Sequence, residues 1–158
     1  MTLFLTSSPS GCPFEPGPAV PVLDTRNHFV ANLRAVWPDH AVLGVSAGSM
    51  NAAHIVYAAP EEPGEAADPH YSRWMNGLGL TETRILPHYQ FIRDHVLDGQ
   101  KMEDIALADS KKRHFLALPD GSYILCADGS EALYGRGWYF ADGMMEEINE
   151  DEDVLPLR

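Results

Sequence analysis

The chain has 158 residues, the length of one ordinary globular domain. With 45% hydrophobic and 22% charged residues it can bury a core, which excludes wholesale disorder. The 23 aspartates and glutamates outnumber the 11 lysines and arginines. The net charge of −12 repels phosphate backbones, so nucleic acid is not an expected partner.

The N-terminal part of the chain predicts one strand and one helix. Residues 3–6 are apolar and compact, as in a short buried strand. Residues 7–23 contain five prolines and are expected to form a long loop. Asp24 can cap a helix over residues 24–36, whose apolar side chains share one face, and Pro38 ends it.

The next segment reads as a strand, a sharp turn and a helix. Residues 41–45 form an apolar run that predicts a strand ending at Ser46. Residues 47–58 are compatible with a helix that stops before Pro60. Residues 59–70 are rich in proline, glycine and acid and predict a surface loop.

The rest of the chain changes from helices to strands. Residues 83–86 predict a short strand, and residues 91–97 and 102–107 predict helical turns. Four short β runs separated by Asp-Gly turns follow, at residues 114–118, 122–127, 131–134 and 138–141. The pattern predicts one α/β domain over residues 1–158, with an antiparallel C-terminal extension and an acidic tail at 146–158.

The cysteines and the N-terminus favour a soluble, cytoplasmic protein. Cys12 and Cys126 are far apart and match no metal-ligand spacing, so reduced thiols are expected. The apolar run at the N-terminus lacks a basic flank and is too short for a signal peptide. No stretch approaches the roughly 20 apolar residues that span a bilayer, so we expect no membrane partner.

The strongest functional signal is the pentapeptide Gly44-Val-Ser-Ala-Gly48. A G-x-S-x-G sequence between a strand and a helix is typical of a nucleophile elbow, a strained turn that exposes the serine hydroxyl. Its glycines are expected because neighbouring side chains would clash there. The amide of Ala47 and the helix N-terminus beside Ser46 can stabilise a developing oxyanion.

A serine nucleophile needs a base, and seven histidines are available. His88 follows a predicted strand directly after Pro87, at the carboxyl end where α/β sheets present functional groups. The remaining histidines lie in predicted helices, polar loops or basic surroundings, where a structural or surface role is expected. His88 and His95 could share a helix face, but without a suitably spaced carboxylate they make a poor metal site. We therefore expect neither a metal nor another cofactor.

Asp120 is the best candidate for the acid that orients the base. It follows an apolar strand in a Pro-Asp-Gly sequence, which an ordinary turn explains equally well. The order Ser46, His88, Asp120 differs from the Ser, acid, His order of α/β-hydrolases, which disfavours a lipase or esterase. The order is that of class I glutamine amidotransferase-like domains, but those use cysteine and take their acid two residues after the histidine, where this chain has Gln90.

With these residues the chain resembles the peptidase E (dipeptidase E, aspartyl dipeptidase) family of serine peptidases, within the class I glutamine amidotransferase-like superfamily. The matching segments cover nearly the whole chain in the family's order: Leu3-Phe-Leu-Thr-Ser-Ser, Gly44-Val-Ser-Ala-Gly-Ser-Met-Asn51, Gly77-Leu-Gly-Leu80, Leu86-Pro-His-Tyr-Gln90 and Ala117-Leu-Pro-Asp-Gly-Ser-Tyr-Ile124.

The resemblance implies a fold, a triad and a substrate class. The implied fold is a glutamine amidotransferase-like (flavodoxin-like) α/β sandwich with a mainly parallel sheet. Ser46 would be the nucleophile, His88 the base and Asp120 the acid, where better-known members have glutamate. The implied substrate is a small peptide, with an N-terminal aspartate favoured in some members.

The chain departs from the family before the nucleophile strand. Members have further strand–helix units and a glycine-rich loop there, whereas here His40 runs straight into Ala41, an apparent internal deletion near 40–41. That loop is expected to supply a second oxyanion amide, and losing one such donor costs on the order of 10²–10³ in rate. Direct pairing of residues 3–6 with residues 41–45 is then allowed as a right-handed crossover. Helix faces left without their usual cover favour either a homodimer or marginal stability.

Two functions stay open at this stage. The first is a serine-type peptidase that hydrolyses short peptides through Ser46, His88 and Asp120. The second is a catalytically impaired, shortened relative that acts as a binding or vestigial module. A glutaminase of the amidotransferase type is disfavoured because Ser46 replaces the cysteine of those domains.

Overall fold

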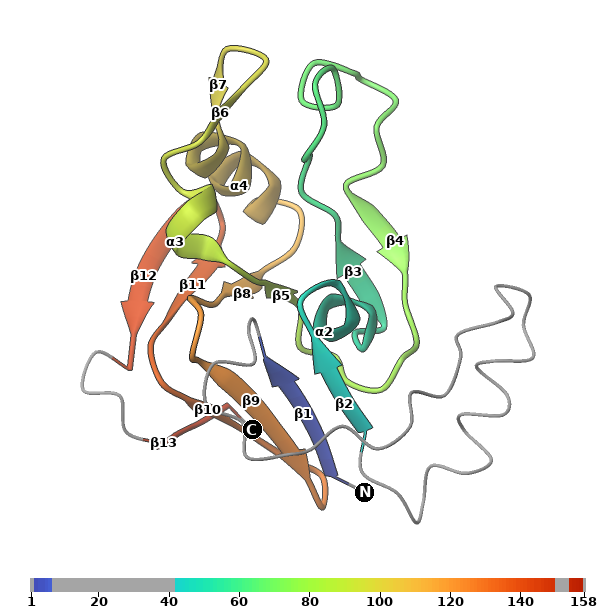
Figure 1. The fold of residues 1–158 in the computed structure, drawn as a ribbon, viewed down its shortest axis with the longest axis vertical. Helices are drawn as coiled ribbons and strands as arrows, with labels where there is room; N and C mark the ends of the chain where they lie inside the picture. The colour runs from blue at the N-terminus through green and yellow to red at the C-terminus, as the bar shows by residue number, and fades with distance from the viewer. Residues whose placement is uncertain (1, 7–41, 150–153, 158) are drawn as a thin grey trace.

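The computed structural model describes residues 2–6, 42–149 and 154–157, which are coloured in Figure 1. Within these ranges the helices are short: α2 (Ala47–Asn51), α3 (Tyr89–Ile92) and α4 (Met102–Ser110). None of them is long and apolar enough to cross a membrane. The predicted loop at 7–23, the predicted helix at 24–36, Cys12 and the junction at 40–41 lie outside the described residues.

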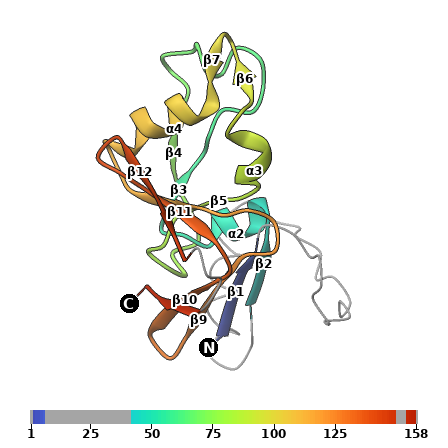
Figure 2. The same ribbon diagram turned by 90° about the vertical axis from the view of Figure 1, so that its left-hand side faces the viewer.

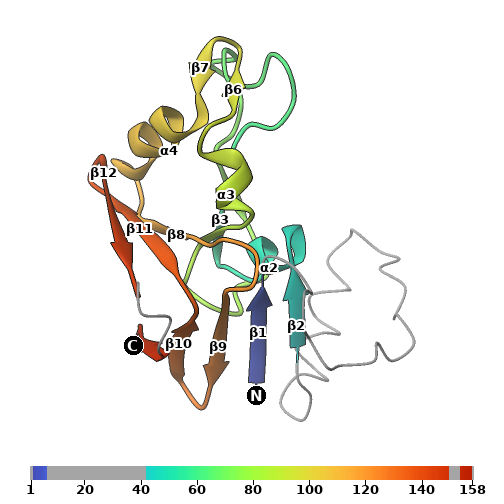
Figure 3. The ribbon, with the colours of Figure 1, turned by 60° about the vertical axis from the view of Figure 1, so that its left-hand side comes forward.

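A five-stranded sheet contains the first strand and the nucleophile strand. Its order is β13-β10-β9-β1-β2, with bounds Val154–Pro156, Ser130–Tyr134, Tyr123–Ala127, Thr2–Thr6 and Val42–Val45. β1 pairs in parallel with β2, so the direct pairing of these two segments that the sequence allows is present (Figure 3). On its other side β1 runs antiparallel to β9, and the remaining pairs are also antiparallel.

A four-stranded sheet leads into His88 and Asp120, the predicted base and acid. Its order is β12-β11-β8-β5, with bounds Met144–Ile148, Gly137–Ala141, Phe115–Ala117 and Ile85–Leu86. Only the β5–β8 pair in this sheet is parallel. Two small antiparallel pairs complete the described strands: β3 (Ile55–Tyr57) with β4 (Trp74–Asn76), and β6 (Val96–Leu97) with β7 (Gln100–Lys101).

The fold class predicted from the sequence is wrong. The described residues form mostly antiparallel and mixed sheets, not a helix-rich flavodoxin-like sandwich around a mainly parallel sheet. One reason lies in the turns after β9 and β11, where Asp128-Gly129 and Asp142-Gly143 have positive φ at both residues. Such two-residue turns return the chain beside itself, so each sheet gains an antiparallel neighbour in place of a crossover.

Several local predictions also change. The helix predicted over 47–58 ends at Asn51, because Ile55, Val56 and Tyr57 enter strand β3, where β-branched and aromatic side chains pack well. The helical turn predicted over 91–97 gives way to strand β6 at its end. Within the predicted acidic tail, residues 146–148 belong to strand β12 and residues 154–156 to β13.

Strand β8 is buried on both faces and separates two apolar clusters. Phe115 and Ala117 lie in the first cluster, where Phe115 stacks between Phe140 at 4.9 Å and Tyr57 at 4.3 Å, measured between ring centroids. Leu116 and Leu118 lie in the second cluster, on the opposite face. This two-sided burial fixes the path of the chain into the turn that carries Asp120.

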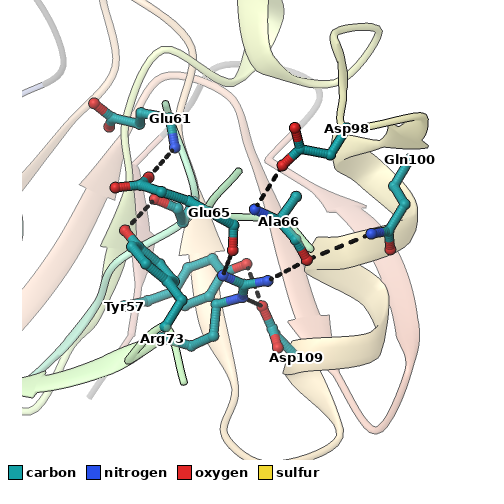
Figure 4. A network of polar contacts seen from close by, with 10 residues as sticks. Tyr57, Glu61, Glu65, Ala66, Arg73, Asp98, Gln100 and Asp109 are labelled. Atoms are coloured by element: carbon teal, nitrogen blue, oxygen red, sulfur yellow. Dashed lines mark hydrogen bonds and ion pairs between the residues drawn. The ribbon is translucent and has the colours of Figure 1, made fainter. Parts of the chain in front are cut away.

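The exposed loop over residues 59–70 is tied to the rest of the molecule by a polar network (Figure 4). Arg73 Nε lies 3.2 Å from an Asp109 carboxylate oxygen, and the same oxygen accepts a 3.0 Å hydrogen bond from the Tyr57 hydroxyl. Burial, together with the adjacent Asp109 charge, raises the pKa of the Tyr57 phenol. Asp98 accepts hydrogen bonds from the amides of Gly64 and Ala66, and Arg73 donates to the carbonyls of Glu65 and Ala66, so the middle of the loop is tied down. The β6–β7 hairpin and α4 lie at the opposite end of the molecule from the lower edge of β1, β2, β9 and β10 (Figure 2).

Candidate active site

The structure brings the three predicted catalytic side chains together. His88 Nε2 lies 2.9 Å from Ser46 Oγ, and His88 Nδ1 lies 2.7 Å from an oxygen of Asp120. Each residue follows the carboxyl end of a strand: Ser46 follows β2, His88 follows β5 and Asp120 follows β8. Both histidine nitrogens are therefore engaged in one chain of polar contacts, from carboxylate to hydroxyl.

Ser46 occupies a strained turn. Its backbone has φ 51° and ψ −123°, a conformation that costs a residue with a side chain about 1–3 kcal/mol. The Ser46 carbonyl accepts hydrogen bonds from the Ser49 amide at 2.9 Å, the Met50 amide at 3.2 Å and the buried Ser49 hydroxyl at 2.5 Å. These contacts hold the turn, and the predicted elbow is present in the backbone.

The two glycines of the elbow have different reasons to be there. A Cβ on Gly44 would lie 2.8 Å from the Gly48 carbonyl oxygen and 2.9 Å from Ser49 Cα, so the strand must carry glycine where the helix folds back on it. A Cβ on Gly48 would meet open space. The expected clash is thus confirmed for Gly44 and wrong for Gly48.

The segment after β4 supports the end of α2. The Leu78 amide donates to the Asn51 carbonyl at 2.8 Å, and the Leu80 amide donates to the Ala52 carbonyl at 2.8 Å. Gly77 passes so close to the Ala53 carbonyl that no side chain fits there. The Gly-Leu-Gly-Leu sequence therefore acts as a brace that keeps the short helix, and with it Ser46, against the sheet.

His88 is fixed by its neighbours on both sides. It has φ 58° and ψ 30° and immediately precedes α3. The next residue, Tyr89, is fully buried, and its amide donates to the Leu118 carbonyl at 3.1 Å. The Tyr89 hydroxyl donates to Glu103 at 3.0 Å, and burial raises the pKa of this phenol. The imidazole thus projects from a backbone that is anchored to the strand end leading to Asp120.

Gln90 contacts the turn that carries the acid, a role that sequence reasoning missed. Its side-chain oxygen accepts a 3.1 Å hydrogen bond from the Asp120 amide. The Ser122 amide donates to the Pro119 carbonyl at 3.3 Å and closes the turn. The sequence signal was the position of Gln90 two residues after His88, which pointed to the place of an acid in related domains and not to a contact with one.

The Ala47 amide lies next to Ser46, the predicted nucleophile. Ala47 is exposed and begins α2, so its N–H has no acceptor within the helix. The loss of a second oxyanion donor was predicted for the segment before β2. That segment lies outside the described residues, so the loss stays a prediction. Among the described residues, no group of three or more histidine, cysteine, aspartate or glutamate side chains is arranged to hold a metal ion.

Comparison with known proteins identifies no family. No family model matches the chain, and no curated protein matches it. Among solved structures, a peptidase from an acI-B1 Actinobacterium is similar with a TM-score of 0.48 and 16% identity. The match covers 74% of this chain and 46% of that chain, so this protein spans less than half of the length of that peptidase. A likeness this distant assigns neither an activity nor a site.

Proposed function

We propose that the protein is a serine-type hydrolase that cleaves short peptides, with Ser46 as nucleophile, His88 as base and Asp120 as the orienting acid. The observation that carries the proposal is the pair of contacts at 2.9 Å and 2.7 Å that links these side chains. Chance alignment is a poor explanation, because the residues come from three different strand ends and two of them have positive φ.

The proposed reaction begins with attack of Ser46 Oγ on the peptide carbonyl carbon. His88 Nε2 takes the hydroxyl proton as the new C–O bond forms, and Asp120 accepts a hydrogen bond from the Nδ1–H and stabilises the imidazolium. The Ala47 amide donates to the oxyanion. The intermediate then collapses with cleavage of the C–N bond, and His88 returns the proton to the leaving amine. Water, activated by the same histidine, releases the acyl group.

The choice of a peptide substrate rests on the resemblance to peptidase E, and the site itself is compatible with it. The His88 and Asp120 side chains are 36% and 30% exposed, so a substrate can reach them from solvent. The surplus of acidic residues disfavours strongly acidic peptides through long-range repulsion. Neutral and basic dipeptides are therefore the first substrates to test.

A labelling experiment tests the proposal. The wild-type protein should react with a fluorophosphonate probe and hydrolyse members of a dipeptide panel, and Ser46→Ala should abolish both. Ser130→Ala is the matched control, because Ser130 is exposed on the β9–β10 hairpin, and it should label like the wild type. Unchanged labelling of Ser46→Ala would refute the assignment of the nucleophile.

The second candidate is a catalytically silent module, favoured by the direct pairing of β1 with β2. The family to which the chain is compared has additional elements before the nucleophile strand, one of which is expected to supply an oxyanion donor. A folded wild-type protein that neither labels nor hydrolyses any dipeptide would support this candidate over the hydrolase.

A further inference from the structure

A cavity opens at the edge of the four-stranded sheet opposite the triad. It has a volume of about 320 Å³, and its lining includes Arg84, His114, Leu116, Tyr139, Ile148 and Leu157. Arg84 precedes β5 and His88 follows it, so the two ends of that segment lie about 13 Å apart at about 3.3 Å per extended residue. The cavity is thus a separate place from the candidate active site.

Basic side chains gather at this cavity and at a hollow beside it, in an otherwise acidic protein. A second, more polar hollow adjoins it, sharing His114 and Tyr139, and is lined also by residues 110–113. Arg84, Lys111, Lys112 and Arg113 make up four of the 11 lysines and arginines of the chain. Within the described part of the chain none of these four takes part in an ion pair.

Among the described residues that line the two hollows, cations outnumber acids. Glu82 lines the first hollow and Asp142 lines the second, against Arg84, Lys111, Lys112 and Arg113. Clustered like charges in a hollow raise the local concentration of ions of the opposite sign. Such a site attracts an anion.

Arg84 supplies a second observation at the same place. Its Nε is shielded from solvent and has no hydrogen-bond partner among the residues that the structure describes. Partial burial and the neighbouring Arg113 charge lower the pKa of Arg84, and the Glu82 carboxylate offsets them only in part. A buried donor without an acceptor is unfavourable, and an anion at this position would satisfy it.

Apart from Thr83, whose hydroxyl donates to Glu131, the remaining walls are apolar. Leu116, Ile148 and Leu157 belong to the cluster between the two sheets, and the Tyr139 ring, 38% exposed, lies 5.8 Å from the His114 ring. We propose that this cavity binds a small amphiphilic anion, with an apolar chain or ring against Leu116 and Tyr139 and an acidic head group at Arg84 and Arg113. A carboxylate and a phosphate share this chemistry, and the test separates them.

The test is a titration of the full-length, isotope-labelled protein followed through backbone amide shifts. The ligands are octanoate, octyl phosphate and, as neutral and head-group controls, octanol and inorganic phosphate. At least one of the two amphiphilic anions should give saturable shifts at Arg84, His114 and Tyr139 and leave Ala47 and Asp120 unmoved. The tighter of the two identifies the head group.

Charge variants decide whether the cations carry the binding. Arg84→Gln/Arg113→Gln should weaken binding at least tenfold. Arg93→Gln/Lys101→Gln loses the same charge outside the cavity lining and should bind within twofold of the wild type. If the first double variant fails to fold, Arg113→Gln alone, an exposed position, should still weaken binding severalfold.

Four outcomes would overturn the proposal: no saturable shift with either anion, equal binding of octanol, equal binding of inorganic phosphate, or unchanged affinity in the cavity variants. The first would mean that the cavity takes no such ligand. The second and third would reduce it to an apolar gap or a surface charge patch. None depends on turnover by Ser46, so the proposal stands or falls apart from the hydrolase assignment.

Discussion

Replacing Gln90 with alanine tests whether the hydrogen bond between Gln90 and the Asp120 amide helps to position Asp120 against His88. The change removes the acceptor of the 3.1 Å hydrogen bond from the Asp120 amide. Because that amide lies at an exposed turn, water can replace the lost acceptor. The loss in unfolding free energy should therefore be small, about 0.5–1.5 kcal/mol.

The effect on catalysis should be larger than the effect on stability. Asp120 orients His88 through a contact of 2.7 Å, and a shift of the turn lengthens that contact directly. A misplacement of about 1 Å can cost about 10²-fold in rate, and loss of the acid's function altogether about 10⁴-fold. We expect Gln90→Ala to lower kcat by about 10–100-fold, up to the effect of a 1 Å misplacement, and to leave KM almost unchanged.

The assay is the rate of fluorophosphonate labelling together with kcat on the best dipeptide. Gln90→Glu keeps an acceptor at the same reach and should recover most of the rate. Gln100→Ala removes an exposed glutamine that contacts the Ala66 carbonyl and serves as the matched control. The decisive measurement is a double-mutant cycle with Asp120→Asn. If Gln90→Ala slows the Asp120→Asn enzyme as much as it slows the wild type, Gln90 does not act through Asp120.

Three further predictions concern the elbow and the core. Gly44→Ala should cost about 1–3 kcal/mol and abolish labelling, because its Cβ meets backbone, whereas Gly48→Ala should label normally, as urea unfolding and probe reaction will show. The hydrogen bond from Lys101 lowers the pKa of Glu103, so this carboxylate stabilises the fold above its ordinary pKa and the contribution is lost as pH falls through the lowered value. Glu103→Gln should thus lower the free energy of unfolding by about 1 kcal/mol at neutral pH, and its urea midpoint should equal that of the wild type in strong acid. An equal loss of stability at both pH values would contradict this. Asp109→Ala leaves Arg73 and Tyr57 without their shared acceptor and should lower the free energy of unfolding in urea by about 3 kcal/mol. No loss would mean that the network in Figure 4 is only a surface feature.

The residues of the candidate site could be selected from the sequence because their signals are local. Ser46 lies in a motif whose strand and glycine context is written in adjacent residues, and His88 and Asp120 each follow a short apolar run. His88 and Asp120 follow the paired strands β5 and β8 of one sheet, whereas Ser46 follows β2 of the other sheet, so their mutual distances also depend on how the two sheets meet. The selection of the three residues rested on strand ends and did not require the correct fold class.

The fold class could not be predicted because strand direction depends on partners distant in sequence. The turn at Asp128-Gly129 predicts that the run at 123–127 pairs antiparallel with β10, but nothing in the run shows that it also pairs antiparallel with the distant β1. The Gln90 contact could not be predicted for a related reason. A hydrogen bond between a side chain and a backbone amide 30 residues away produces no repeating pattern in the sequence. Strand β3 was missed because its three residues continue a helical pattern from α2.

The backbone of Ser46 has a consequence for the balance between stability and activity. At φ 51° and ψ −123° the residue occupies a region that glycine enters freely and serine does not. Ser46→Gly and Ser46→Ala both remove the hydroxyl and should both be inactive. Ser46→Gly should have the higher melting temperature, because Ser46→Ala keeps the Cβ. As the proposed nucleophile, Ser46 keeps its side chain at a position where glycine would give a more stable fold, so stability gained at this position would cost the proposed activity.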